Sequence, residues 1–231
     1  VLLTDSLNYE RDAELGYFFA GGTLLDEENT LTSDYGQFHT PTKMATFMKD
    51  VFLESEDYNL SSDTLLYNTD LHTAYFVSPT EIISDETTIH TNNGNFNTDL
   101  KEAVLLNRSV IIQKDGEQTM VGDSIIFNEA EGQAEAFGNV EIRNYTDKLD
   151  VDGEYAYFNH QNDSAVVTGN ALAIEYSTGD SLYIHADTFR LLTFYNATKD
   201  TVLYREMRAF NKVKAYRTDM QMVADSLVFN S

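Results

Sequence analysis

An internal repeat of about 30 residues runs through this chain and constrains its fold more than any other feature. Its most regular element is the pattern Asp-x-apolar-x-aromatic. Four clear copies occur, at Asp5–Tyr9, Asp63–Tyr67, Asp123–Phe127 and Asp225–Phe229. Weaker copies begin at positions 34, 92, 153 and 187, so that most successive steps are 29 to 31 residues. One unit of this size cannot bury its own apolar face, and stacked neighbours must cover it.

A second motif lies between these anchors and combines a small residue, a turn pair and an alternating apolar stretch. Its best copy is Ala136–Ile142, with Gly138-Asn139 as the pair. Alternation with period two is the signature of a strand, and Gly-Asn pairs tolerate the positive φ of turns. We therefore expect two strands per repeat, joined by short turns at these pairs. The eight repeats then predict an all-β chain of about sixteen antiparallel strands.

The charge of the chain limits the partners that it can take. Its formal net charge is −23, and binding to nucleic acid needs a basic surface, so we expect no nucleic-acid partner. Seven of the 15 basic residues lie between Arg190 and Arg217. Such a run is either a solvated face or a docking surface for a partner or an anionic ligand.

Signatures of catalysis and of metal binding are missing from the sequence. The chain has no Cys, which excludes disulfides, thiol catalysis and Cys-ligated metals. Its five His residues form no His-Glu-x-x-His pattern, and no Gly-x-Ser-x-Gly motif occurs. The fragment Asp150-x-Asp152-Gly153 resembles part of a calcium loop but lacks the other ligands, which leaves only a weak surface site open. We expect no enzyme, no cofactor and no metal centre.

The repeats resemble those of the OstA/LptA family of lipopolysaccharide-transport proteins, in the form found in Bacteroidota-type bacteria. The resemblance rests on the pairs in Gly138–Ile142 and Gly169–Ala171 and on anchors such as Asp63–Tyr67, and it covers almost the whole chain. It implies one continuous domain over residues 1–231, folded as an open-ended twisted β-jellyroll. Because the chain begins with Val1 inside a repeat, we also expect a processed or trimmed piece.

The same resemblance implies a function. It implies a scaffold in the periplasm, or at the periplasmic face of the outer membrane. Acyl chains of lipopolysaccharide or a similar lipid would travel in a hydrophobic β-groove toward the outer membrane. Other Lpt-type β-jellyroll proteins would join through open sheet edges, and the chain would associate head to tail with itself.

Alternate residues of the two motifs point to one face of the sheet and are our candidates for the groove wall. They are Leu7, Tyr9, Val51, Leu53, Leu65, Tyr67, Val110, Ile112, Ile125, Phe127, Val140, Ile142, Tyr155, Tyr157, Phe189, Leu227 and Phe229. These side chains either line an open groove or fill a closed core, and the sequence leaves both open. A filled core would favour the alternative function, a non-catalytic structural or adhesive β-repeat module at the cell surface.

Overall fold

The computed structural model describes residues 1–26, 29–113, 116–128, 130–198 and 201–230. Within these ranges the chain forms twenty strands, and the pairings between them are antiparallel, as between β7 and β8 or β18 and β19. The expected all-β, open-ended antiparallel fold is confirmed. The chain divides into two compact units, a first unit at Val1–Lys114 and a second unit at Asp115–Ser231. One continuous domain over residues 1–231 stays a prediction.

The first unit contains thirteen strands among its described residues, most of them short. They are β1 (Leu2–Thr4), β2 (Asn8–Glu10), β3 (Leu15–Phe18), β4 (Gly22–Asp26), β5 (Asn29–Ser33), β6 (Tyr35–His39), β7 (Met44–Glu54), β8 (Tyr58–Asn68), β9 (Thr73–Phe76), β10 (Thr80–Ser84), β11 (Thr87–Thr91), β12 (Asn93–Asn97) and β13 (Glu102–Gln113). Short strands pair in twos with one long strand. Both β5 and β6 pair with β7, and both β9 and β10 pair with β8, so each such pair is one interrupted strand.

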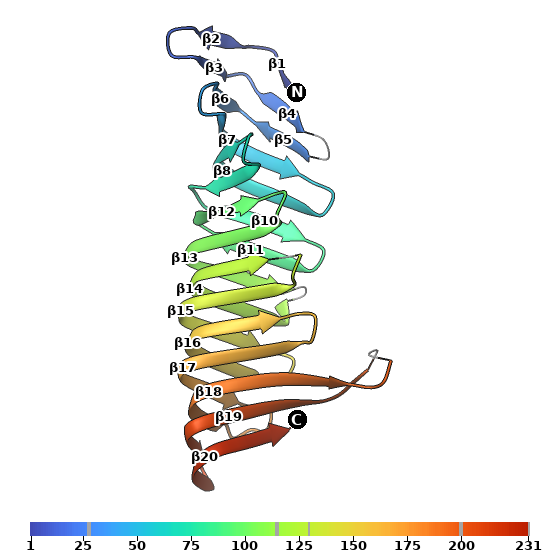
Figure 1. Cartoon of the computed structure of the whole chain (residues 1–231), viewed down its shortest axis with the longest axis vertical. Coiled ribbons are helices and arrows are strands. Elements are labelled where there is room, and N and C mark those ends of the chain that lie inside the picture. Colours follow the sequence, from blue (N-terminus) through green and yellow to red (C-terminus); the bar gives the residue numbers. More distant parts are fainter. Residues whose placement is uncertain (27–28, 114–115, 129, 199–200, 231) are drawn as a thin grey trace. The chain divides into compact units, whose positions relative to one another are not determined.

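The second unit is a meander of long strands (Figure 1). They are β14 (Gln118–Asn128), β15 (Gln133–Asn144), β16 (Leu149–Asn159), β17 (Ser164–Glu175), β18 (Leu182–Tyr195), β19 (Val202–Arg217) and β20 (Met220–Asn230). Each strand pairs with the next one along the chain. In the described residues β20 pairs only with β19, which makes it an edge strand.

Alternate long strands carry a two-residue bulge at one position, and within each unit these positions line up as a corner. In β15 the bend falls at Gly138-Asn139, where φ is 71° and 45° and the register with β16 shifts between Phe137 and Val140. Unequal residue counts on paired strands make a β-bulge, which bends the strand. The other positive-φ pairs of this kind are Lys49-Asp50, Asn107-Arg108, Gly169-Asn170 and Asn211-Lys212.

The Gly-Asn pairs are therefore not the turns that join strands, and this part of the sequence prediction was wrong. Gly138-Asn139 lies in the middle of β15, whereas the chain reverses direction at residues 145–148 and 160–163. The physical reason is that a bulge of this type and a tight turn both need positive φ, so they select the same residues.

The repeated Asp of the first motif faces the pair of the second motif across the corner. The Asn139 side-chain amide donates a hydrogen bond to the Asp123 carboxylate at 2.7 Å. A Cβ atom on Gly138 would lie 2.7 Å from the same carboxylate oxygen, so any other residue there would have to displace the Asp123 side chain. Asp34 forms an ion pair with Lys49 in the same way. The two sequence motifs are thus the two strands of one repeat, each at its bend.

The strand count differs from the expected sixteen because the corner interrupts several strands of the first unit. Asp34 separates β5 from β6, and Asn92 separates β11 from β12. Pro79 lies between β9 and β10, where the missing N–H donor ends the ladder. In the second unit the strands continue through the bend as bulges, and the expected count of two strands per repeat holds there.

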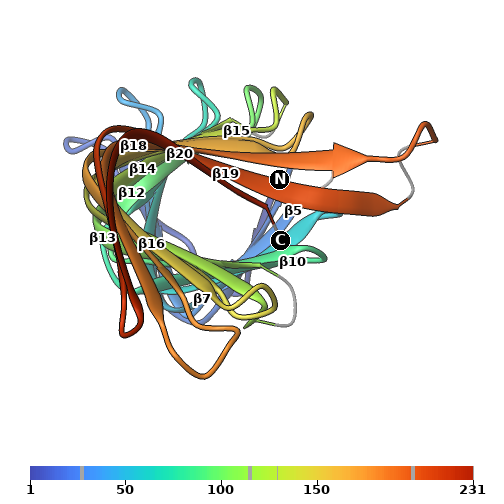
Figure 2. The same cartoon turned by 90° about the horizontal axis from the view of Figure 1, so that it is seen from below.

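Bending at the corner turns one face of each strand inward. In β17 the inward residues Ala165 and Val167 precede the bend and Ala171 and Ala173 follow it, and each is buried. Figure 2 looks onto the second unit and shows β19 running along one side, bending and returning along another. Each unit therefore has two walls that meet at the corner and enclose an interior.

Candidate functional site

The interior of the second unit is apolar on both walls. Its most deeply buried side chains are each at most 1% exposed. They are Ile125, Ala136, Ala156, Val167, Phe189 and Ala209 on one wall, and Val140, Val151, Ala171, Ile184, Ala186 and Val213 on the other. Small and branched aliphatic residues allow the walls to approach closely. The interior near the corner is consequently closed.

Burial of the inward side chains decreases away from the corner. Phe127 and Phe158 on one wall and Leu149 on the other are only half-buried. These residues mark the open side between the free ends of the two walls, which we call the mouth. Apolar groups at the mouth are the ones that a ligand would meet first.

The interior of the first unit combines apolar side chains with buried hydroxyls. Leu60, Leu65 and Leu105 are each at most 1% exposed. Along the corner, however, hydroxyl side chains bond to one another. The Ser62 hydroxyl lies 2.9 Å from that of Thr80. The full row of buried hydroxyls at this corner is Ser33, Ser62, Thr80, Thr91 and Ser109.

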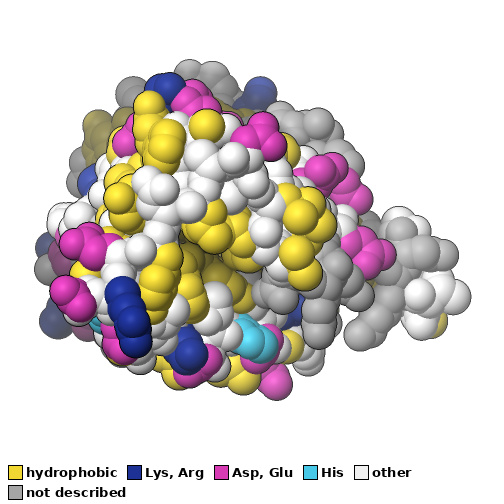
Figure 3. All heavy atoms as spheres, turned by 90° about the horizontal axis from the view of Figure 1, so that it is seen from above, with side chains coloured by type: hydrophobic (Ala, Val, Ile, Leu, Met, Phe, Trp, Pro, Cys, Tyr) yellow, Lys and Arg dark blue, Asp and Glu magenta, His cyan; other side chains and the backbone are white. Residues whose placement is uncertain are grey.

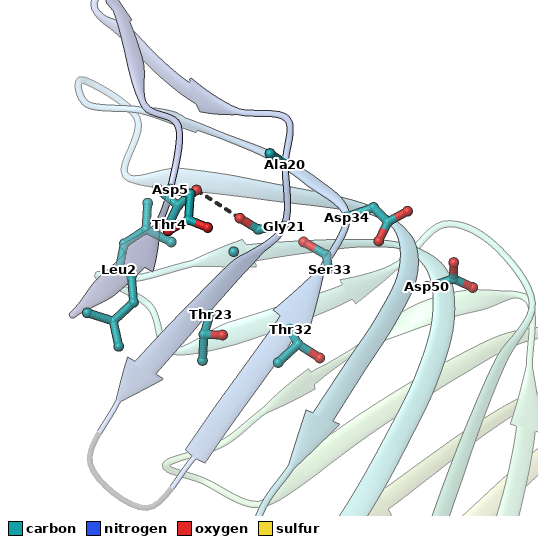
Figure 4. Close-up of a pocket in the computed structure, with 12 residues that line it drawn as sticks. Leu2, Thr4, Asp5, Ala20, Gly21, Thr23, Thr32, Ser33, Asp34 and Asp50 are labelled. Carbon is teal, nitrogen blue, oxygen red and sulfur yellow. Dashed lines mark hydrogen bonds between the residues drawn. The ribbon is translucent and has the colours of Figure 1, made fainter.

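Two open pockets lie along the corner of the first unit. One has a volume of about 680 Å³, and Figure 4 shows Thr4, Ser33, Asp34 and Asp50 around it, with the Thr4 hydroxyl donating to the Gly21 carbonyl at 2.8 Å. The other has a volume of about 800 Å³ and is lined by corner residues of β7, β8, β10, β11 and β13. The first is mostly polar, and the second is lined about equally by polar and apolar groups. Hydrophobic side chains gather instead around a hollow at the N-terminal end of the first unit (Figure 3).

Most of the predicted groove residues face the interior of their own unit. The strand register and the burial pattern place these on the inward face: Val51, Leu53, Leu65, Tyr67, Ile125, Phe127, Val140, Ile142, Phe189, Leu227 and Phe229. Their contact with lipid stays a prediction. Tyr9 pairs with Gly16 at the head of an inward column, yet it is 57% exposed, and Leu7 just before β2 is 61% exposed.

Four predicted residues lie on the outward face, in two places. In β16, Tyr157 pairs with the outward Glu135, while the buried Ala156 pairs with the buried Ala136. Tyr155 shares the outward face with Tyr157. The sequence alignment took Gly153 as the equivalent of the anchor Asp, but the corner places Glu154 there, beside Gly169. A slip of one residue moves every side chain to the other face.

The same slip affects β13. Its corner pair is Asn107-Arg108, so the inward residues are Ser109 and Ile111. Val110 pairs with the exposed His90, and Ile112 shares that outward face. Sequence reasoning therefore missed Ile111, Ala156 and Phe158 as inward residues. Matching the second motif by its positive-φ pair, and the first by its acidic residue, would have found them.

Polar side chains on the outward face of the second unit are paired with one another. The Tyr155 hydroxyl donates to the Glu135 carboxylate at 2.6 Å, and burial, followed by this hydrogen bond, raises the pKa of Tyr155 to about 12. Arg143 bonds Asp152 at 2.5 Å and Glu141 at 3.1 Å. Burial opposes the charge of Arg143, but these carboxylates outweigh it and raise its pKa.

The calcium-like fragment is occupied by this arginine. Asp152 and Asp150 lie 2.5 Å and 3.7 Å from Arg143 nitrogens, so the guanidinium holds the place where a cation would bind. Elsewhere in the described residues, no three His, Asp or Glu side chains come together in a way that could hold a metal ion. Those residues also include no helix long and apolar enough to cross a membrane.

Comparisons with known proteins show what the chain resembles. No curated protein matches the chain. Among solved structures, LptH from Pseudomonas aeruginosa, described as the LptA homologous periplasmic component of the lipopolysaccharide transport device, is 16% identical with a TM-score of 0.39 over 43% of this chain and 75% of LptH. The WD40 domain of SCAP from fission yeast is 6% identical with a TM-score of 0.14, over 98% of this chain and 76% of that one.

A family model gives the stronger result. The model described as OstA-like protein matches residues 1–63 and 101–178, which is more than half of the chain. These ranges include the Gly138-Asn139 and Gly169-Asn170 pairs on which the resemblance was first noted. The resemblance is confirmed, and the chain belongs to the OstA-like protein family.

Proposed function

We propose that this chain is a periplasmic scaffold that binds lipopolysaccharide and carries its acyl chains in the apolar interior toward the outer membrane. Membership of the OstA-like family supports this proposal. LptH is described as a component of a lipopolysaccharide transport device, and lipopolysaccharide is therefore the ligand that we propose. No catalytic step is part of the proposal, because an amphiphile can be bound by burial of its chains alone.

The observation that carries the proposal is the apolar inward face of the second unit. One buried row crosses the five strands β14 to β18 without a charged side chain in it, and its members are Ile125, Ala136, Ala156, Val167 and Phe189. Each methylene of an acyl chain gains roughly 0.8 kcal/mol when it leaves water for such a surface. Charged sugars and phosphates would stay outside, since the interior offers them no partners.

The closed interior near the corner sets the route of entry. Side chains such as Ala136 and Ala171 are fully buried, so an acyl chain enters only if the walls part. Phe127 and Phe158 at the mouth are half-buried and would be the first to contact it. We therefore propose a resting state with a closed interior that opens from the mouth.

Open edges would supply the protein partners. The outward residues Val223 and Val228 of the edge strand β20 are 80% and 55% exposed. An unpaired edge is a template for strand addition. We propose that other β-jellyroll proteins of the transport system, or a second copy of this chain, join there. Light scattering over a range of concentrations tests self-association, and Val223→Lys with Val228→Lys should abolish it.

The lipid proposal is tested by photocrosslinking at two adjacent positions. Benzoylphenylalanine replaces Phe127, which faces the interior, or Ile126, which is 42% exposed on the outward face. The folded proteins are isolated from the periplasm and irradiated, and bound lipopolysaccharide is identified by native mass spectrometry. We expect adducts at 127 and none at 126.

Two results would count against the proposal. Equal labelling at 126 and 127 would mean that lipid adheres to the surface without entering. No labelling at either position, with added lipopolysaccharide and a folded protein, would favour the alternative of a structural or adhesive module. If lipid is bound, Phe127→Asp and Tyr67→Asp show which unit carries it. Loss of lipid in Phe127→Asp assigns the ligand to the second unit, and loss in Tyr67→Asp assigns it to the first.

A further inference from the structure

The β18–β19 hairpin is longer than its neighbours at one end. Leu192 pairs with Ser164, the first residue of β17, and Glu206 pairs with Asn230, the last residue of β20. The residues of β18 and β19 beyond these positions pair only with each other in the described part of the chain. Figure 1 shows this segment projecting past the other strands of the second unit. We call residues 193–196 and 201–205 the strap.

Two side chains tie the strap to turns of the same unit. The Tyr195 hydroxyl donates to Asp163, in the turn between β16 and β17. Arg205 donates to Asp147, in the turn between β15 and β16. Hydrogen bonds hold that second turn in shape, because the Asn144 side chain bonds both the backbone N–H and the carboxylate of Asp147 at 2.8 Å.

The Arg205–Asp147 pair joins opposite ends of the strands. Asp147 lies just before Leu149, which pairs with Glu175, and Glu175 pairs with Leu182, the first residue of β18. The strap is at the other end of this strand of 14 residues. A straight strand of that length would span about 45 Å. The two groups meet only because the walls fold back toward each other at the corner, and their contact therefore crosses the mouth.

The strap has a stiff outer side and a releasable fastening. Phe194 and Tyr204 stack with their ring centroids 4.5 Å apart and their planes at 15°, which braces the two strands. The Arg205 and Asp147 side chains are 42% and 24% exposed, and ion pairs that water can reach are weak. The family model does not extend over these residues, since its match ends at residue 178.

We propose that the strap is a gate over the mouth of the second unit, with Arg205–Asp147 as its fastening. It releases to let the alkyl chains of an amphiphile enter sideways and refastens over them. This inference rests on the proposed function, because it names the entrance to the same interior. Opening separates the Arg205–Asp147 ion pair and the Tyr195–Asp163 bond.

The test is a reversible lock across the mouth. The chain has no Cys, so Asp147→Cys with Arg205→Cys gives two unique thiols. An Arg–Asp pair can reach farther than the short span of a disulfide, so a short bifunctional methanethiosulfonate reagent makes the link. Arg217→Cys with Asp219→Cys is the matched control, because that pair is local to one turn. Uptake of fluorescently labelled lipopolysaccharide is followed with time.

We expect the locked protein to take up lipid at least about tenfold more slowly, as when opening must precede binding. Reduction should restore the rate, and the linked control should match the wild type. If the locked protein and the wild type take up lipid equally fast, the gate is wrong and the proposed function stands. If the wild type takes up no lipid at all, the proposed function is wrong and the gate falls with it.

A second experiment exchanges the two charges of the Arg205–Asp147 pair and needs no crosslinking reagent. Arg205→Asp or Asp147→Arg alone should speed uptake about two- to fivefold, the range expected for loss of an exposed ion pair. The double exchange, Arg205→Asp with Asp147→Arg, should return the rate to that of the wild type. Single variants that leave the rate unchanged, in a wild type that does take up lipid, would overturn the role of this pair as the fastening.

Discussion

Each unit has a corner of its own, and the two corners are lined by different side chains. In the first unit the inward row contains the buried hydroxyl residues Ser33, Ser62, Thr80, Thr91 and Ser109 together with the apolar Val51. In the second unit the corresponding row contains Gly122, Val140, Gly153, Ala171, Ala186 and Val213. The first unit therefore has a polar corner and the second an apolar one, although the strands fold alike around both.

The difference follows from how each unit bends. In the first unit several strands break at the corner, beside the continuous β7, β8 and β13, and a buried backbone carbonyl at a break needs another donor. The Ser33 hydroxyl donates to the Tyr35 carbonyl at 2.9 Å, and the Thr91 hydroxyl to the Asn93 carbonyl at 2.9 Å. In the second unit the strands run through the bend as bulges. An apolar row then suffices, and the interior stays suited to alkyl chains along its whole depth.

The largest effect should come from altering a bulge of the second unit. Gly138 has φ 71°, and a side chain there would meet Asp123. We expect Gly138→Val to lower the free energy of unfolding by about 3 kcal/mol, from strain in this backbone region together with the clash. Urea unfolding measures it. Gly179→Ala is the control, since its φ is 48° but nothing lies within 4 Å. Equal losses would mean that strain alone, and not the corner, matters.

Exchanging the corner chemistry of the two units should be harmful in both directions. Thr91→Ala removes the hydroxyl that donates to the Asn93 carbonyl at 2.9 Å and accepts from the Ser109 hydroxyl at 2.8 Å. Ala171→Ser places a hydroxyl in an apolar row. Each should cost about 1–3 kcal/mol of unfolding free energy, the usual cost of an unsatisfied buried polar group. Hydrogen exchange assigns the loss to one unit. An Ala171→Ser protein as stable as the wild type would remove the distinction drawn between the corners.

A smaller effect should appear in alkaline solution and only in the second unit. Folding raises the pKa of Tyr155 from 10.0 to about 12, so the folded state holds this proton more tightly than the unfolded chain. Its contribution to stability is full below pH 10 and is lost as the pH rises toward 12. Tyr155→Phe should flatten the fall in unfolding free energy over that range. Tyr157→Phe, on the same face, is the control, and identical profiles for the two would contradict the assignment.

The smallest effect should come from the ion pair at the corner of the first unit. Lys49 and Asp34 have side chains that are 58% and 43% exposed. Lys49→Met should lower the unfolding free energy only slightly, because water and salt screen such pairs. Measurement at low and high salt separates the electrostatic part, which should vanish at high salt. A loss that persists in salt would indicate that the lysine stem packs on Tyr35, whose ring centroid lies 5.7 Å from its amine.

Much of this fold could be predicted from the repeats. Period-two alternation and the spacing of the anchors predicted strands, their antiparallel stacking and the inward position of Ile125, Phe127 and Val140. The inward face could not be assigned where the anchor was degenerate. At Glu154 the alignment slipped by one residue, and Tyr155 and Tyr157 were placed inside although they lie outside. Alternation has only two states, so a single misplaced bulge reverses every residue after it.

By itself the sequence determined the length of the repeat, the position of each bend and the apolar character of one face, because these depend on neighbours a few residues apart. Tertiary structure decided which strands are interrupted, how tightly the walls close and which side chains lie at the mouth. Arg205 and Asp147 are 58 residues apart and meet only after two walls have folded at the corner. Such a contact depends on the accumulated geometry of several strands, and no local pattern of residues encodes it.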